Sequence, residues 1–179
     1  MVFNAVERSR GTSRAHFVPS LLGWALQRCP PFTVARAIAA ALRFGGAQVA
    51  PSVIFWGMPT VIGPATQLQI GDLCGLNFGC YFELDAPVTL ESHVAVGHEV
   101  MFLTRTYEAG EPGQGARPSG AKPIRIGAGS WLGSRCTILP GVTVGAGSVV
   151  GASAVVREDV PANTLVSGTR RLSLGKWRG

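Results

Sequence analysis

A repeat of six residues in the last third of the chain restricts its fold more than any other feature of the sequence. Six hexads run without a gap from Ile126 to Pro161 and read IGAGSW, LGSRCT, ILPGVT, VGAGSV, VGASAV and VREDVP. Every first position is Ile, Leu or Val, four of the six second positions are Gly, and every fifth position is small or β-branched. Neither the 3.6-residue period of a helix nor the two-residue alternation of one strand produces this pattern.

Such a repeat suits a short strand followed by a corner, and three of these units make one turn of a triangular prism. The aliphatic side chain points to the prism axis and the small residue packs beside it. Glycine at the corner is expected to permit backbone angles that other residues resist. Stacked turns bury a continuous aliphatic column that no single turn forms alone. The repeat therefore predicts an all-β chain of stacked parallel strands.

The same register extends toward the N-terminus. Two earlier turns carry apolar first positions, namely Ile70, Leu76 and Phe82, and Leu90, Val96 and Phe102. Residues 49–69 are expected to form an irregular first turn. Residues 107–123 interrupt the repeat and are rich in Gly and Pro, and an excursion of this length from a rigid prism is usually functional.

A helical pattern precedes the repeat over residues 19–44, interrupted by Pro30-Pro31 and ended by Gly45-Gly46. It predicts a helical hairpin packed on the main domain, and the alternative is attachment of its basic face to a membrane surface. The expected domains are a basic N-terminal helical segment over 1–48, the stacked strands over 49–168 and a basic C-terminal tail over 169–179.

Positive charge is concentrated at the two ends of the chain. Residues 1–46 carry six Arg against one Glu, and residues 169–179 carry three Arg and one Lys, in a chain of formal net charge +6. A nucleic-acid-binding domain more often shows a basic stripe with aromatic residues on its folded part, so we expect no nucleic-acid partner. Basic ends suit phosphate-bearing ligands or an anionic membrane surface.

The remaining composition favours an oligomer in a reducing compartment. Charged residues make up 15% of the chain, below the average of about 25%, which is expected where much of the surface is hidden against another chain. The four Cys lack metal-ligand spacing, and the N-terminus shows no apolar stretch with a cleavage site. We therefore expect reduced thiols and a cytoplasmic location, with membrane-peripheral attachment as the alternative.

The stretch from Ile126 to Gly168 resembles the hexapeptide-repeat acyltransferases, in particular the branch of maltose/galactoside and polysaccharide O-acetyltransferases, and the resemblance covers residues 49–172. It implies a left-handed parallel β-helix, an exception to the right-handed crossover rule, assembled as a homotrimer with active sites between neighbouring prisms. It also implies acetyl-CoA or another acyl-CoA as co-substrate. The acceptor would be a hydroxyl or amine of a sugar, glycolipid or small natural product.

The family's general base is a His that precedes the long loop, and the resemblance places Tyr107 at that position. A phenol has a pKa near 10 and an imidazole near 6.5, so using an unperturbed phenol as a base at pH 7 costs about 4 kcal/mol unless a cation such as Arg105 assists. The alternative is that Tyr107 is a hydrogen-bonding or stacking residue, with another base or no acyl transfer at all. His98 is the other candidate base. It lies nine residues earlier, about a face and a half around the prism, and a surface imidazole is its structural alternative.

Further residues match family positions. Asn77 and Asp85 match residues near the acceptor and the base; Trp131, Ser134 and Ala152 match contacts to the pantetheine arm; Arg157, Arg170 and Arg171 are assigned to the nucleotide phosphates. Corner capping, packing between subunits and solvation are the respective structural alternatives. No metal is expected, because a zinc site would need three His with one from a neighbouring strand, and the only His besides His93 and His98 is His16 in the basic N-terminal segment.

The replacement of the family's base leaves two functions open. One is acyl transfer with a changed base or a changed acceptor, such as an amine that needs less help from a base. The other is a family member that uses the cleft between subunits for different chemistry or as a binding scaffold.

Overall fold

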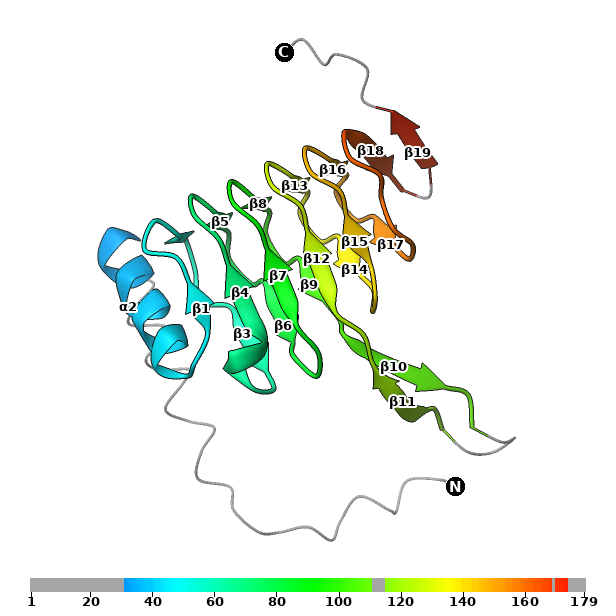
Figure 1. Cartoon of the computed structure of the whole chain (residues 1–179), viewed down its shortest axis with the longest axis horizontal. Coiled ribbons are helices and arrows are strands. Elements are labelled where there is room, and N and C mark those ends of the chain that lie inside the picture. The colour runs from blue at the N-terminus through cyan, green and yellow to red at the C-terminus, as the bar shows by residue number, and fades with distance from the viewer. Residues whose placement is uncertain (1–30, 111–114, 169, 174–179) are drawn as a thin grey trace, which may run out of the picture.

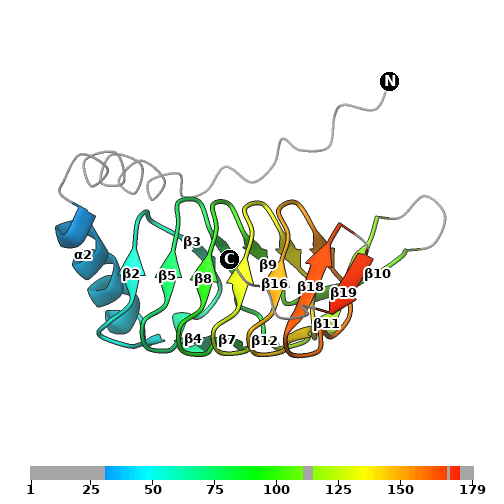
Figure 2. The same cartoon turned by 90° about the horizontal axis from the view of Figure 1, so that it is seen from above.

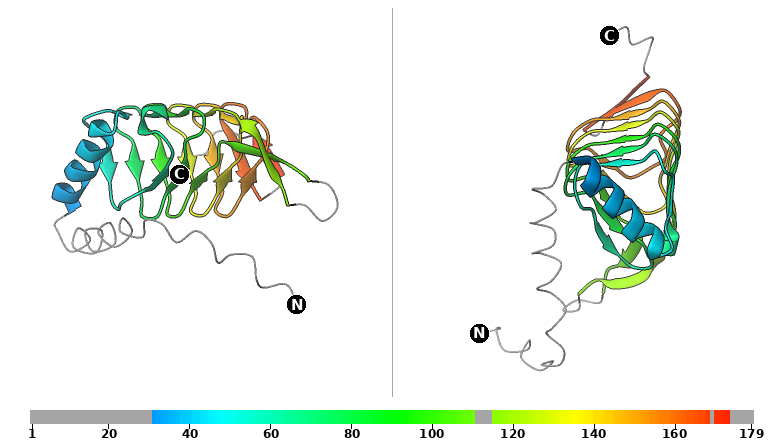
Figure 3. Two further views of the ribbon diagram at one scale, coloured as in Figure 1. Left: turned by 90° about the horizontal axis from the view of Figure 1, so that it is seen from below. Right: turned by 90° about the vertical axis from the view of Figure 1, so that its left-hand side faces the viewer.

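The hexads become short parallel strands that wind into a left-handed β-helix, which confirms the predicted fold class (Figure 1). The computed structural model describes residues 31–110, 115–168 and 170–173. Among these residues, five turns of three strands follow one another, and a sixth turn begins at Val160, which bridges Val144, and continues into β18. The view along the axis shows the turns enclosing a prism (Figure 3).

The three sides of the prism are parallel sheets, here called faces A, B and C. Face A contains β1 (Gln48–Val49), β4 (Leu68–Ile70), β7 (Val88–Leu90), β12 (Ile124–Ile126) and β15 (Thr143–Val144). Face B contains β2 (Ile54–Phe55), β5 (Gly75–Leu76), β8 (Ala95–Val96), β13 (Trp131–Leu132), β16 (Val149–Val150) and β18 (Thr164–Ser167). Face C contains β3 (Thr60–Ile62), β6 (Tyr81–Glu83), β9 (Met101–Phe102), β14 (Thr137–Ile138) and β17 (Val155–Val156).

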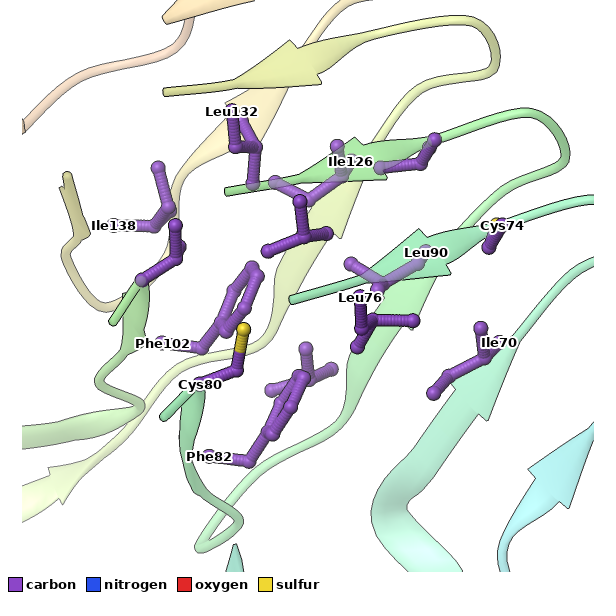
Figure 4. Close-up of a cluster of buried hydrophobic side chains, with 14 of the residues drawn as sticks. Ile70, Cys74, Leu76, Cys80, Phe82, Leu90, Phe102, Ile126, Leu132 and Ile138 are labelled. Carbon is purple, nitrogen blue, oxygen red and sulfur yellow. The ribbon is translucent and has the colours of Figure 1, made fainter. Parts of the chain in front are cut away.

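First hexad positions form the core, as the repeat predicts. The inward side chains from Ile70 to Val156 at these positions are all buried, with at most 3% of their surface exposed, and Figure 4 shows how they stack along the axis. The rings of Phe82 and Phe102 are stacked with their centroids 4.6 Å apart. Each fully buried Leu, Ile or Phe contributes about 1.5–3 kcal/mol, so this column is the main source of stability.

Glycine at the second hexad position makes room for the next turn. A Cβ added at Gly97, Gly127, Gly133 or Gly145 would lie 2.4–2.6 Å from a backbone nitrogen of that turn, and none of the four has a positive φ. The expectation that these glycines permit unusual backbone angles is therefore wrong. Positive φ occurs at other corner positions, several of them occupied by larger residues: Leu73, His93, Glu99, Arg135, Ser153 and Asn163.

The ends of the β-helix differ from the expected boundaries. The first turn is regular in its strands, and its irregularity is confined to a 3₁₀ turn at Ala65–Gln67. At the other end, β19 (Arg170–Ser173) folds back antiparallel on β18, so the segment expected as a tail begins with a strand. Of the predicted helical hairpin, the first helix lies outside the described residues.

Helix α2 (Pro31–Phe44) packs across the N-terminal end of the prism (Figure 1). Ile38 and Ala39 are buried against the first turn. Arg43 donates from Nε to the carbonyl oxygen of Val49 at 2.8 Å and from Nη2 to that of Ala50 at 3.0 Å, so this cation fastens the helix to β1. None of the described helices is long and apolar enough to cross a membrane.

The excursion is a β-hairpin that projects from the prism (Figures 1 and 2). Strand β10 (Arg105–Glu108) pairs antiparallel with β11 (Arg117–Ala121), so the departure from the repeat starts two residues earlier than predicted. The pairing shifts register between Thr106 and Tyr107. Such bulges re-aim side chains and are common beside active sites.

We expect Gly127→Ala to destabilise the protein by about 1–3 kcal/mol, because the added methyl group overpacks the contact between turns. The matched control is Gly115→Ala, since nothing lies within 4 Å of a Cβ added there. Urea unfolding followed by circular dichroism measures both variants. Equal free energies of unfolding would contradict the steric explanation.

Two buried thiols make the free energy of unfolding depend on pH in the alkaline range. Burial raises the pKa of Cys80 to about 11 and that of Cys136 to about 12, from 9.0. Because the unfolded chain ionises first, their contribution to the free energy of unfolding is complete below pH 9.0 and is lost as the pH rises through about 11 for Cys80 and about 12 for Cys136. We expect the double variant Cys80→Ala, Cys136→Ala to lose stability less steeply than the parent over this range. Parallel curves in a pH series of urea titrations would refute the assignment.

Candidate functional site

Two edges of the prism carry the predicted site residues. Edge BC, where face B passes into face C, is a column of corners made by residues 77–79, 97–99, 133–135 and 151–153. Edge CA, where face C passes into face A, carries the hairpin of β10 and β11. The register of the strands therefore decides which side chains meet.

Edge BC brings a histidine together with predicted contacts to the pantetheine arm. His98, Ser134 and Ala152 occupy matching positions in successive turns. The main-chain N–H of His98 donates to Ser134 Oγ at 3.2 Å. Trp131 stands on the adjoining strand β13 with 53% of its surface exposed. The structure thus lines up four of the predicted residues along one flank of the molecule.

The imidazole of His98 is held by an aromatic neighbour. It stacks on the ring of Phe78 in the preceding turn, with centroids 6.1 Å apart and planes 12° from parallel. Beside it, Arg135 Nε contacts Glu99 Oε2 at 2.6 Å. This hydrogen bond, with the charge of Arg135, lowers the pKa of Glu99. A carboxylate therefore accompanies the imidazole on the same corner.

Asn77 has a structural role within the chain. Its Nδ2 donates to the carbonyl oxygen of Val96 at 3.0 Å, which ties its corner to the next turn. The residue also lies on edge BC, one turn before His98. The family resemblance assigned Asn77 to the acceptor side, whereas in the structure its amide nitrogen binds a main-chain carbonyl of the next turn.

Edge CA holds a second group, called the Arg105 cluster and consisting of Asp85, Arg105 and Tyr107. Arg105 donates to both carboxylate oxygens of Asp85, from Nε at 3.1 Å and from Nη2 at 2.9 Å. Its Nη1 donates to the Tyr107 hydroxyl over 3.5 Å. The hydrogen bonds to Asp85 and then to Tyr107 raise the pKa of Arg105, which therefore stays cationic.

Thr104 anchors this cluster, and sequence reasoning missed it. Its buried hydroxyl donates to the carbonyl oxygen of Glu83 at 2.8 Å and accepts the N–H of Asp85 at 3.1 Å. The N–H of Arg105 donates to Glu83 Oε2 at 3.0 Å. The available signal was a polar residue two positions after the inward-facing Phe102, where the strand alternation expects an apolar side chain.

Other predicted residues are not brought to edge BC. Arg157 is exposed after β17, where face C passes into face A. Arg170 and Arg171 lie on β19, opposite Ser167 and Val166 of β18. Their side chains are not among those that the structure describes. His93 occupies the corner between faces A and B, and His16 lies outside the described residues. No group of three or more metal-ligating side chains occurs in the described part of the chain.

The fold and the repeat define a hexapeptide-repeat β-helix, and comparison with known proteins agrees. Residues 123–158 match the family described as bacterial transferase hexapeptide (six repeats). A crystal structure of a hexapeptide-repeat acetyltransferase from Vibrio cholerae, complexed with acetyl coenzyme A, superposes with a TM-score of 0.65 at 28% identity, covering 89% of this chain and 85% of that one.

Curated relatives carry acetyltransferase names. A protein of Schizosaccharomyces pombe named as a candidate acetyltransferase is 38% identical over 93 residues, which are 52% of this chain and 45% of the relative. Galactoside O-acetyltransferase of Escherichia coli is 29% identical over 110 residues, 62% of this chain and 54% of the relative. The chain spans about half the length of the curated relatives it matches. The resemblance to the hexapeptide-repeat acetyltransferases is thus confirmed.

We expect Asn77→Ala to lower the free energy of unfolding by about 1 kcal/mol in the absence of any ligand, because the carbonyl of Val96 loses the side-chain donor and keeps only the main-chain N–H of residue 77. Thermal unfolding of the unliganded protein measures the change. Ser134→Ala is expected to have a similar effect through the N–H of His98. A stability identical to the parent for Asn77→Ala would assign Asn77 to ligand contact alone.

Proposed function

We propose that this chain transfers an acyl group, acetyl in the first instance, from coenzyme A to a hydroxyl or amine of a carbohydrate or related small molecule. The observation that carries the proposal is the column of His98, Ser134 and Ala152 on edge BC, flanked by the exposed Trp131. The likeness over most of the chain to a structure complexed with acetyl coenzyme A supports it. The E. coli relative's name, galactoside O-acetyltransferase, supports a sugar acceptor.

Edge BC has the shape that an extended thioester arm requires. Gly97, Gly133 and Gly151 let successive turns meet closely, because a Cβ on each would lie 2.6–3.1 Å from a backbone atom of the next turn, so the corners of this edge stack without a gap. Successive turns lie about 4.8 Å apart, and the edge therefore runs straight across several turns. Trp131 offers a large apolar surface beside it, and apolar contact suits the methylene groups of such an arm.

His98 is the base in this proposal. The acceptor oxygen or nitrogen bonds to the thioester carbonyl carbon while the imidazole takes its proton. The carbon–sulfur bond then breaks, and the imidazolium returns the proton to the thiolate. A thiol with a pKa near 8.5 leaves readily, and an imidazole is the side chain best suited to take up a proton near neutral pH. Phe78 and Ser134 fix the position of this ring and its main chain.

The site belongs to an assembly of several copies, for which the homotrimer implied by the resemblance is our proposal. The outward positions of face A are polar in register: Gln48, Gln69, Thr89, Arg125 and Thr143. Those around edge BC include exposed large apolar residues: Ile54, Trp56, Met58, Phe78, Met101 and Trp131. Apolar patches on this scale usually mark protein contacts, so a second copy is expected against edge BC.

A second function remains supported by one observation, the Tyr107 at the family's His position. A scaffold that has exchanged acyl transfer for binding at the same cleft would keep the fold and lose turnover. Three further predictions from the sequence stay predictions. They are the binding of the C-terminal arginines to nucleotide phosphates, membrane contact of the N-terminal segment, and the cytoplasmic location.

Coenzyme A is expected to raise the melting temperature of the purified protein, because a ligand that binds only the folded state stabilises it. Trp131→Ala should remove most of this shift. Val149→Ala, on the same face, is a control for the general effect of truncating that surface. An unchanged melting temperature with saturating coenzyme A would contradict the proposed binding edge.

The base is tested by acetyl transfer to panels of sugar and amine acceptors. His98→Gln should lower kcat by about 10²–10⁴-fold, because an acid–base group is lost, and should leave stabilisation by coenzyme A intact. His93→Gln is the matched control, since this exposed histidine lies on a different edge. Equal activity of the two variants would refute the role of His98. Silence of the parent with every acceptor would favour the scaffold.

A further inference from the structure

A base on edge BC gives no role to the Arg105 cluster, which is formed by Asp85, Arg105 and Tyr107. We propose that Tyr107 is a hydrogen-bond donor to the oxyanion of the acyl-transfer intermediate, aimed by Arg105, which Asp85 fixes in place. This inference rests on the proposed acyl transfer and assigns the residue at the family's base position a different role.

The direction of the hydrogen bond carries the first step. A phenol oxygen accepts and donates at the same time. In this structure Arg105 Nη1 donates to the Tyr107 oxygen, so the accepting side of the hydroxyl faces a cation. The O–H is therefore directed away from Arg105, and Tyr107 is 54% exposed. The hydroxyl can therefore still donate one hydrogen bond, to a group outside the cluster.

The charge balance of the cluster carries the second step. Arg105 would favour an ionised phenol if its charge were uncompensated. Both carboxylate oxygens of Asp85 accept from the same guanidinium, so the pair is neutral as a whole. Across the hairpin, the register partner of Tyr107 is Pro118, which carries no charge. The charge of Arg105 is thus already paired with Asp85, and the Tyr107 hydroxyl that it contacts acts as a donor.

The placement of the hydroxyl carries the third step. Thr104 and Glu83 hold the start of β10, and the register shift between Thr106 and Tyr107 sets the direction of the side chain. Face C separates Tyr107 from His98 of the same chain. The hairpin projects from the prism (Figure 1), and in the proposed homotrimer it would carry this hydroxyl to the edge BC of a neighbouring copy.

The reaction balances with this division of roles. The acceptor atom bonds to the carbonyl carbon, and the carbonyl electron pair moves onto oxygen, where the Tyr107 O–H donates. Collapse restores the carbonyl and expels the thiolate, which receives the acceptor's proton from His98. Tyr107 begins and ends protonated. A preorganised donor of this kind contributes about 10²–10³-fold to kcat.

The test compares Tyr107→Phe with Tyr81→Phe, since Tyr81 is the other tyrosine of the chain. With acetyl-CoA and the best acceptor, Tyr107→Phe should lower kcat about a hundredfold and leave the KM for acetyl-CoA within about threefold, whereas Tyr81→Phe should match the parent. Arg105→Gln should also lower kcat. Adding it to Tyr107→Phe should cost little more, because the two residues act as one unit.

The pH profile separates a donor from a base. Ionisation of a phenol removes its O–H, so a donor makes kcat fall at alkaline pH, and Tyr107→Phe removes the fall. A base makes kcat rise over the same range. A rising profile, or a Tyr107→Phe variant within twofold of the parent, overturns the inference while acyl transfer stands. A parent without turnover on any acceptor overturns the proposed function and this inference together.

Discussion

Close stacking of one turn on the next is the constraint on which this structure depends. The main-chain N–H groups of Gly127 and Gly133 each donate to the following turn at 2.7 Å, and a Cβ on either residue would collide with that turn. Because every turn meets the next in the same register, residues far apart in sequence reach one edge at matching heights. His98 and Ser134 are neighbours for this reason. The scaffold's regularity thus fixes the position of the site before any side chain is chosen.

The core and the strand register follow from the sequence, and the contents of the corners do not. An aliphatic residue every six positions was enough to place Leu90, Leu132 and Val150 inside. The role of the glycines does not follow from the repeat, because the steric room that they provide depends on two neighbouring turns. A single hexad does not show how close those turns lie. The hydrogen bonds of Thr104 could not be predicted from the sequence either, because they join segments about twenty residues apart.

The candidate site divides between two edges in a way that the sequence alone did not reveal. Asn77, His98, Ser134 and Trp131 gather around edge BC, whereas Asp85 and Tyr107 meet Arg105 at edge CA. A single prism therefore separates what the family resemblance assigns to one centre. Contact between copies brings the two halves together in the proposed assembly. The residue that the resemblance places at the family's base position, Tyr107, belongs to the half that carries the hairpin.

An element that departs from the parallel stack lies at each end of the prism, and this has a consequence for its growth. A stack of parallel strands presents unpaired N–H and carbonyl groups at each end, which is a template for adding further strands. Helix α2 lies across the first turn, fastened by Arg43. On face B, β19 runs antiparallel to β18 and so breaks the parallel pattern that another prism would have to continue. These two elements oppose end-to-end polymerisation, so that association is directed to the sides, where the proposed active sites are.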